Sequence, residues 1–248
     1  MMGKQANFVL GWVGLATLGN HNTGDWIFQR LYEMNAVDLP LDQIARNLTD
    51  SATRDFAALP VSSAEGRCHF VLGGWHKDSG PPKPFTCVIF NDFIFHPAQG
   101  QNLATFSRAA QATQSFFYSI ATFQEVKRPF YVFPIGDFQP KTLRSHFSGL
   151  KSLMKKGAET AAISAVCRQI ALEAARHTTT ISRNLISIEM DNKGRVRNSY
   201  YSEDGAEAML IPDILSPQGP LLKSTLSTYI EGDQITLKFR GKTVKPKA

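Results

Sequence analysis

The chain has 248 residues, of which 43% are apolar and 19% are charged, and its formal net charge is +6. The apolar share supplies a buried core and excludes a disordered class, while apolar runs far shorter than ~20 residues exclude a transmembrane helix. The first residues show no signal-peptide pattern, so we expect a cytoplasmic protein without a membrane partner.

The first 60 residues predict one strand and two helices. Residues 8–15 form an apolar run typical of a buried strand, and glycines at its end permit a tight turn. Polar residues at 22–25 then supply caps for an amphipathic helix over residues 26–31. A second helix opens at residues 39–42, and its expected apolar stripe consists of Ile44, Leu48, Ala52 and Phe56.

The middle of the chain predicts a hairpin. Residues 68–75 and 85–91 are strand-like, and the turn formers at residues 77–82 favour a direct connection between them. A further strand is expected at residues 130–133. No element is assigned to residues 102–122, where the pattern is mixed.

A long helix followed by a hairpin marks the second half. Alanines give residues 157–176 a high helix propensity, and their small side chains predict close approach to a neighbour. Residues 185–190 alternate like a strand, and a turn leads into a partner strand at residues 195–201. Runs of helices and hairpins, rather than alternating strands and helices, favour the α+β class.

The C-terminal end carries most of the excess positive charge. After Asp233 there is no acid, and five basic residues follow: Lys238, Arg240, Lys242, Lys245 and Lys247. We therefore predict a single domain over residues 1–235 and a solvated basic tail over residues 236–248. Since Phe239 is the only aromatic residue among these cations, we expect no nucleic-acid partner.

The cysteines and histidines predict neither a metal site nor a cofactor. Cys68, Cys87 and Cys167 are odd in number and widely spaced, which argues against a disulfide framework and a structural zinc site. Their settings favour buried thiols. No two histidines have the i, i+4 spacing of a helical metal site, and no glycine loop continues into a phosphate-binding motif.

A polar group at the junction between loop and helix is the candidate pocket. Asn22, Thr23 and Asp25 lie within four residues of one another. Such side chains bind ligands, but they also cap helices, because a side-chain oxygen can accept a hydrogen bond from an amide of the first turn. Both interpretations stay open at this point.

The order of these elements resembles the later part of a proteasome β subunit or a bacterial proteasome-like relative, over residues 6–205. Residues 8–15 resemble the family's strand that ends in a glycine-rich turn beside the active site, and residues 25–31 resemble the helix after it. Residues 70–75, which end in Gly-Gly-Trp, are similar to the next family strand. Residues 157–176 and the following hairpin resemble the family's last long helix and its hairpin.

The resemblance implies an α+β fold, a four-layer αββα sandwich of two antiparallel sheets, with the first hairpin missing. It also implies kinship with the N-terminal nucleophile hydrolases. In their proteasome branch a leading threonine attacks the substrate carbonyl and its own α-amine, with a pKa near 8, acts as the base. Backbone amides at the glycine-rich turn stabilise the oxyanion, and Gly14 and Leu15 are the corresponding candidates here.

The chain departs from the family pattern at its start. It begins with two methionines, so we expect no threonine, serine or cysteine to present a leading amine. Lys4 lies nearer the glycine turn than the family's lysine does, so it does not inherit that role. Residues 177–183 stand where the family has a supporting aspartate and Ser-Gly-Gly. No catalytic residue is therefore assigned.

Three hypotheses follow. The first is a catalytically inactive proteasome-like protein, a pseudoenzyme that acts as a structural or assembly subunit. The second is an N-terminally incomplete threonine-type peptidase or amidohydrolase, which would take a peptide substrate only with an upstream segment. The third is a non-enzymatic α+β binding module whose basic tail contacts an acidic partner. Under the first two we expect a homo-oligomer, because family members stack into rings and an unpaired sheet edge invites another strand.

Overall fold

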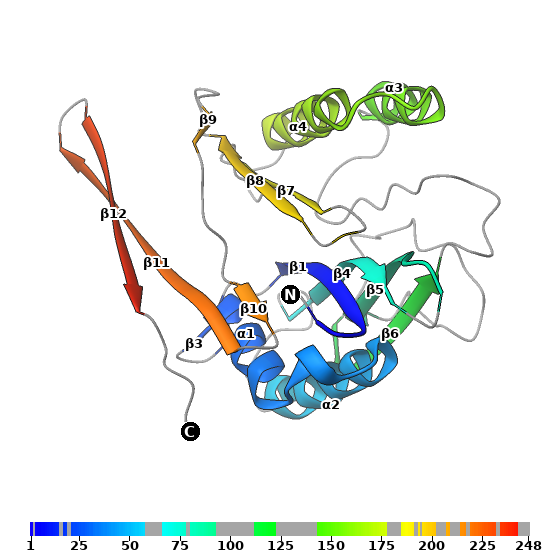
Figure 1. The fold of residues 1–248 in the computed structure, drawn as a ribbon, viewed down its shortest axis with the longest axis vertical. Coiled ribbons are helices and arrows are strands. Elements are labelled where there is room, and N and C mark those ends of the chain that lie inside the picture. The colour runs from blue at the N-terminus through cyan, green and yellow to red at the C-terminus, as the bar shows by residue number, and fades with distance from the viewer. Residues whose placement is uncertain are drawn as a thin grey trace.

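The computed structural model has a mixed α+β fold built on a four-stranded antiparallel sheet (Figure 1), so the α+β class expected from the sequence is confirmed. The described residues are 1, 3–14, 17–18, 21–57, 66–77, 80–92, 112–122, 143–177, 185–190, 193, 195–201, 207–208, 214–216, 219–231 and 234–242.

Four long strands form the central sheet. In sheet order they are β1 (Ala6–Gly14), β4 (Cys68–His76), β5 (Lys83–Asp92) and β6 (Ala112–Thr122), and each pairs antiparallel with its neighbour. β1 and β6 are therefore the two edges of this sheet. The expected hairpin in the middle of the chain is confirmed as β4 and β5.

Two helices cover one face of the sheet (Figure 1). They are α1 (Thr23–Glu33) and α2 (Leu41–Ala57), and the short helix η1 (Ala36–Asp38) joins them. A small ladder of β2 (Thr17–Leu18) and β3 (His21–Asn22) precedes α1. The two helices predicted for this part of the chain are confirmed.

The main core lies between this sheet face and the two helices. Trp26 of α1 stacks on Phe70 of β4 with ring centroids 5.7 Å apart, and Phe56 of α2 meets Phe116 of β6 edge-on at 5.0 Å. Such aromatic pairs add about 0.5–1.5 kcal/mol to the gain from burial alone. The apolar stripe predicted for α2 is confirmed, since residues three or four positions apart share a helix face, and all its members are buried: Ile44, Leu48, Ala52 and Phe56.

A second group of elements lies on the other side of the sheet. β7 (Leu185–Met190) and β8 (Val196–Tyr201) form the hairpin expected from the sequence, and β9 (Glu207–Ala208) extends it. The indole Nε1 of Trp75 donates a hydrogen bond to the Met190 carbonyl oxygen at 3.3 Å. This contact joins the central sheet to the hairpin.

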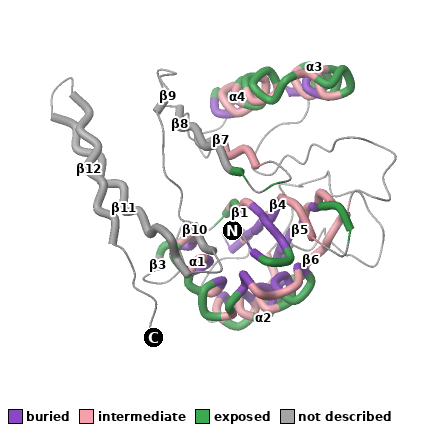
Figure 2. The backbone as a smooth tube through the Cα atoms, in the orientation of Figure 1, coloured by how far each residue is buried: buried purple, intermediate pink, exposed green. Residues whose placement is uncertain are grey.

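Two further helices, α3 (Arg144–Lys155) and α4 (Thr160–His177), lie beyond the hairpin. The alanine-rich helix predicted over residues 157–176 is confirmed as α4, and its Ser164 Oγ donates to Glu189 Oε1 of β7 at 2.9 Å. Figure 1 therefore shows four successive groups, namely α1–α2, the central sheet, β7–β8 and α3–α4. Most described residues of α3 and α4 are exposed or half-buried (Figure 2).

The C-terminal part forms a separate small sheet in the order β10 (Ile214–Ser216), β11 (Gly219–Glu231) and β12 (Gln234–Lys242). The register of β11 and β12 places Ser227 opposite Lys238 and Thr225 opposite Arg240. Most of the segment that the sequence assigned to a basic tail is thus strand β12. Residues 243–248 lie outside the described part.

Three details differ from the sequence predictions. β1 is buried only in its first three residues, and Gly11 and Trp12 are exposed. Cys167 is exposed, whereas Cys68 and Cys87 are buried as expected. β6 and α3 had no counterpart in the sequence analysis. The strand expected at residues 130–133 lies outside the described residues.

Candidate functional site

The end of β1 and the start of α1 contain the residues that the sequence singled out. Gly14 is the last residue of β1, Asn22 immediately precedes α1, and Thr23 and Asp25 lie in the first turn of the helix. Leu15 lies outside the described residues. This region is called the β1–α1 corner below.

Trp12 brings the two elements of the corner together. A β-carbon added to Gly24 of α1 would lie 2.8 Å from Cη2 of Trp12, so the indole rests on the first turn of the helix. Glycine at position 24 leaves room for the ring. Trp12 is nevertheless 41% exposed, and it forms the outer surface of the corner.

Gly14 occupies a backbone position that only glycine adopts without strain. Its φ angle of 112° lies in a region that L-residues rarely enter. A β-carbon at this position would also lie 1.9 Å from the Arg67 carbonyl oxygen. The end of β1 therefore approaches the backbone before β4 more closely than a side chain would permit.

Asn91, at the end of β5, fixes the backbone against which Gly14 lies. Its Oδ1 accepts a hydrogen bond from the Cys68 amide at 2.8 Å, and its Nδ2 donates to the carbonyl oxygens of Gly66 and Thr113 at 2.8 and 3.2 Å. One buried side chain thus joins the ends of β4, β5 and β6. Sequence analysis missed Asn91, and the only signal was a polar residue at the end of an apolar strand.

Asn22 is the N-cap of α1. Its Oδ1 accepts a hydrogen bond from the Gly24 amide at 2.7 Å, and its backbone is extended, with φ −65° and ψ 136°. Thr23 is buried at the start of the helix. Asp25 is exposed in the first turn, where the helix dipole favours a carboxylate. The Gly24 amide, which could otherwise bind an anionic ligand, is therefore already hydrogen-bonded to the capping side chain of Asn22.

The α-amine of Met1 lies at the other end of β1. It donates to the Phe8 carbonyl oxygen at 2.5 Å, and burial lowers the pKa of this amine to about 6. Phe8 and Gly14 are separated by six positions of strand, which is about 20 Å at ~3.3 Å per residue. The structure therefore does not bring this amine to the corner that contains Gly14.

His69 and Cys87 are buried groups whose pKa values are strongly shifted. Burial, together with the positive charge of Arg67, lowers the pKa of His69 to about 4. Burial raises the pKa of the Cys87 thiol to about 12. At neutral pH the imidazole is therefore uncharged and the thiol is protonated, which makes Cys87 a poor nucleophile. The sequence did not single out His69.

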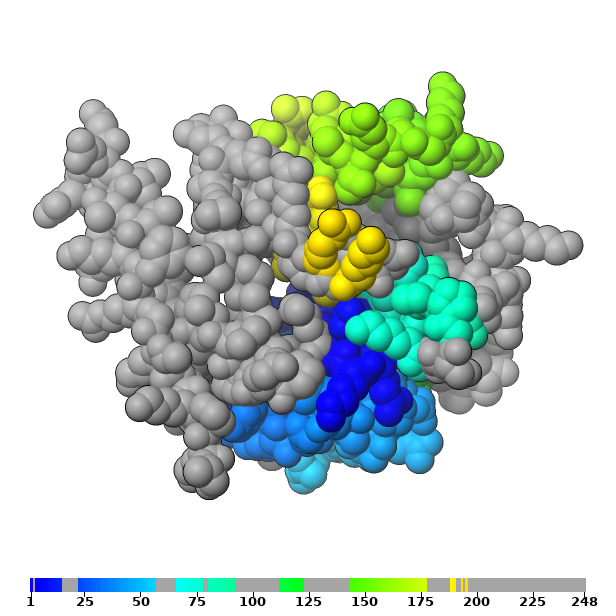
Figure 3. Space-filling model, in the orientation of Figure 1, coloured from blue at the N-terminus to red at the C-terminus, as the bar shows by residue number. Residues whose placement is uncertain are grey.

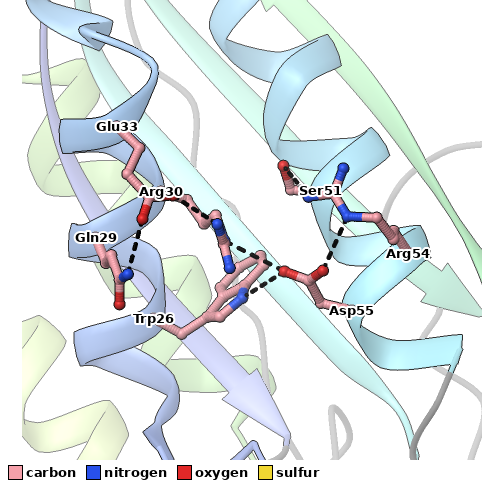
Figure 4. A network of polar contacts seen from close by, with 7 residues as sticks. All are labelled: Trp26, Gln29, Arg30, Glu33, Ser51, Arg54 and Asp55. Atoms are coloured by element: carbon pink, nitrogen blue, oxygen red, sulfur yellow. Dashed lines mark hydrogen bonds and ion pairs between the residues drawn. The ribbon is translucent and has the colours of Figure 1, made fainter.

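A polar network holds α1 against α2 (Figure 4). Trp26 Nε1 donates to Asp55 Oδ2 at 3.0 Å, and Arg30 Nε lies 3.2 Å from the same oxygen. Arg54 Nε donates to the other carboxylate oxygen of Asp55 at 3.0 Å. Because Asp55 satisfies the indole N–H of a buried aromatic, the network stabilises the packing of the two helices.

In the described part of the chain, no three His, Cys, Asp or Glu side chains are grouped so that they could hold a metal ion. None of the helices in the described ranges has both the length and the hydropathy of a bilayer-spanning segment.

Comparisons with protein-family models, with curated proteins and with solved structures find no match to this chain.

Proposed function

We propose that this chain is a catalytically inactive, self-associating structural subunit with a four-layer αββα fold of the proteasome-like type. The main observation behind the proposal is the spatial order of the layers. In Figure 1, α1–α2, the central sheet, the β7–β8 hairpin and α3–α4 follow one another. The contact of Trp75 with Met190 and that of Ser164 with Glu189 join successive layers.

The chain order of the elements supports the same proposal. After β1 come the helices α1 and α2, the β4–β5 hairpin, the long helix α4 and the β7–β8 hairpin, in the order on which the resemblance rests, with β6 and α3 as additions. β1 is also an edge strand of the central sheet. An open edge favours association with another strand.

The hydrogen bonds around the β1–α1 corner support a structural role for it. The Gly24 amide is bonded to Asn22, and Cys68 and Gly66 are bonded to Asn91. The buried amine of Met1 is bonded to Phe8 instead of lying at the corner. Groups that are preorganised for catalysis point at the position of the reacting atom, whereas these are satisfied within the fold.

Covalent labelling tests the absence of threonine-type activity. The purified protein is incubated with fluorogenic peptides and with a threonine-directed covalent inhibitor, and intact mass is then measured. The proposal predicts no hydrolysis and no adduct. An adduct on any residue would contradict it and would support the active-hydrolase hypothesis.

A second candidate function is a binding module that contacts an acidic polypeptide through β12. The sequence of β12 favours it, because basic residues recur at alternate positions of this strand, namely 238, 240 and 242. In the backbone register Lys242 pairs with a further basic residue, Lys223 of β11. Such a row would attract a polyanion in a salt-dependent way.

This second candidate is tested with a triple variant in which Lys238, Arg240 and Lys242 become glutamine. The probe is polyglutamate, and binding is measured at low and at moderate salt. The matched control removes the same charge from α3 and its C-cap at Lys151, Lys155 and Lys156, all of which are exposed. Loss of binding in the β12 variant alone supports the module, while equal loss in both variants would mean a general charge effect.

A further inference from the structure

Among the described residues, β1 has a partner strand on one side only, so the backbone groups at the centre of its outer edge have no strand partner there. In an antiparallel strand the N–H and C=O of one residue point to the same side, and successive residues alternate. Phe8 directs both groups away from β4, since its amide donates to the Met1 carbonyl oxygen at 2.9 Å and its own carbonyl accepts from the Met1 amine. Leu10 and Trp12, two and four positions further on, therefore also direct their amides and carbonyls outward.

This edge lacks the usual features that prevent strand addition. Natural edges are commonly protected by charged residues, proline or bulges. β1 contains no charged residue and no proline, and its register with β4 is regular from Ala6 to Gly14. Gly11 and Trp12 are exposed. In Figure 3 the dark blue atoms of residues 1–14 reach the surface between the blue atoms of α1–α2 and the yellow atoms at the end of β7 and just after it.

We propose that β1 of one copy pairs antiparallel with β1 of a second copy, about a two-fold axis at Gly11. This inference rests on the self-association in the proposed function and names the surface that mediates it. In this register Leu10 faces Trp12 of the other copy, and each pair exchanges two backbone hydrogen bonds. The two central sheets would then form one continuous sheet across the dimer.

Gly11 suits the centre of such a pair. Its own N–H and C=O point inward to β4, so the two Gly11 residues would form a non-hydrogen-bonded pair, in which Cα atoms approach to about 4.5 Å. No atom lies within 4 Å of a β-carbon added to Gly11, so this face of the strand is open. The pairing ends at Phe8, because Met1 already occupies its outward groups. A short pairing of this kind gives a concentration-dependent dimer rather than an obligate one.

The second edge, β6, is partly closed. The Phe116 amide, which points outward, donates to Thr53 Oγ1 of α2 at 2.9 Å. The exposed aromatic of this strand, Phe117, lies on a sheet face and packs against Phe90 with ring centroids 6.2 Å apart. The β1 edge, with an exposed glycine between two outward-pointing residues, is therefore the better surface for a second copy.

Charge substitutions at Gly11 test the two-fold pairing. Gly11→Lys and Gly11→Asp each place like charges directly opposite one another in the dimer, which destabilises a cross-strand pair. Each variant alone is expected to dimerise roughly tenfold or more weakly than the original chain. An equimolar mixture of the two variants places lysine opposite aspartate, so the dimer should reform as a heterodimer.

Gly73 provides the matched control. It lies on the same sheet face as Gly11 but in the interior strand β4, opposite Val9, and no atom lies within 4 Å of its added β-carbon. Gly73→Lys and Gly73→Asp should leave association unchanged. Circular dichroism of all four variants verifies that they fold, and sedimentation velocity over a range of concentrations measures association.

The possible results separate this inference from the function on which it rests. Weakened association of both Gly11 variants with recovery in the mixture supports the β1–β1 dimer. If the chain associates but the Gly11 variants associate equally well, or if mixing restores nothing, the β1 surface is wrong while self-association stands. If the original chain stays monomeric at every concentration, both the inference and the proposed self-association are overturned.

Discussion

The two pairs of helices are similar in length but differ in what they bury. α1 and α2 place large side chains such as Trp26, Ile44 and Phe56 in the core. The buried side chains of α3 and α4 in the described residues are Leu150 and the alanines at 174 and 175. Since stabilisation grows by about 25 cal/mol for each Å² of apolar surface buried, α1, α2 and the sheet hold most of the stability. High helix propensity, as in α4, is therefore no measure of how much a helix stabilises the fold.

A matched pair of Ile→Ala substitutions tests this difference most strongly. Ile44 of α2 is 0% exposed, whereas Ile170 of α4 is half-buried. We expect Ile44→Ala to lower the free energy of unfolding by about 4 kcal/mol, because it removes buried methylenes and leaves a cavity, and Ile170→Ala by about 1 kcal/mol. Urea unfolding followed by circular dichroism measures both. Equal losses would contradict the proposed difference between the layers.

Two glycines of β1 differ in how much room they leave for a β-carbon, so alanine substitutions at both test the packing within the sheet. Gly14→Ala introduces a β-carbon at φ 112° and against the Arg67 carbonyl oxygen, while Gly11→Ala meets no atom within 4 Å. The expected losses in unfolding free energy are about 3 kcal/mol for Gly14→Ala and less than about 0.5 kcal/mol for Gly11→Ala. Thermal and urea unfolding provide the values. A tolerated alanine at position 14 would show that the close approach to β4 is not required.

The pH dependence of stability tests the buried state of His69. Its folded pKa of about 4 lies below the ordinary histidine pKa of 6.5, so the folded state binds the proton less readily than the unfolded chain does. The contribution of His69 to the free energy of unfolding is therefore largest above pH 6.5 and falls as the pH is lowered toward 4. We expect a loss of about 2 kcal/mol between pH 7 and pH 5.

His69→Gln serves as the control for this titration. Carboxylates and the Met1 amine titrate in both proteins, so the difference between the two stability curves isolates the histidine. The difference should change by about 2 kcal/mol over this pH range. If the two curves of stability against pH are parallel, His69 binds a proton as readily in the folded protein as in the unfolded chain, which would contradict the prediction.

Removal of the N-cap side chain of α1 is expected to have the smallest effect on the free energy of unfolding. Asn22→Ala removes the acceptor for the Gly24 amide and should lower the free energy of unfolding by about 1 kcal/mol. Ser145→Ala in the first turn of α3 is the comparison, because the N-cap of that helix, Leu143, makes no side-chain capping bond. A change within about 0.5 kcal/mol is expected there. Similar losses at the two sites would contradict a specific capping role for Asn22.

Sequence patterns identified the elements whose periodicity is strong. The stripe of α2 and the paired strands β4 and β5 follow directly from apolar spacing and from the turn formers between the strands. β6 was missed because Gln114 and Ser115 interrupt its apolar pattern near the edge of the sheet. α3 was missed because its basic and polar residues leave only Leu150 fully buried.

The sequence contains a turn signal for the C-terminal hairpin, but the excess of positive charge favoured a different prediction. Gly232 and Asp233 are the two residues between the paired ends Glu231 and Gln234, and such a dipeptide between alternating segments is typical of a hairpin. The excess of lysine led to the prediction of a solvated tail instead. Asn91 could not be found from sequence, because its three backbone partners come from segments about 20 residues away in both directions.

Light scattering coupled to size-exclusion chromatography tests the central claim most directly. A structural subunit that assembles with its own copies should show a mass that rises with concentration from 27.5 kDa toward a whole-number multiple of it. A constant mass of 27.5 kDa at all concentrations would contradict the account.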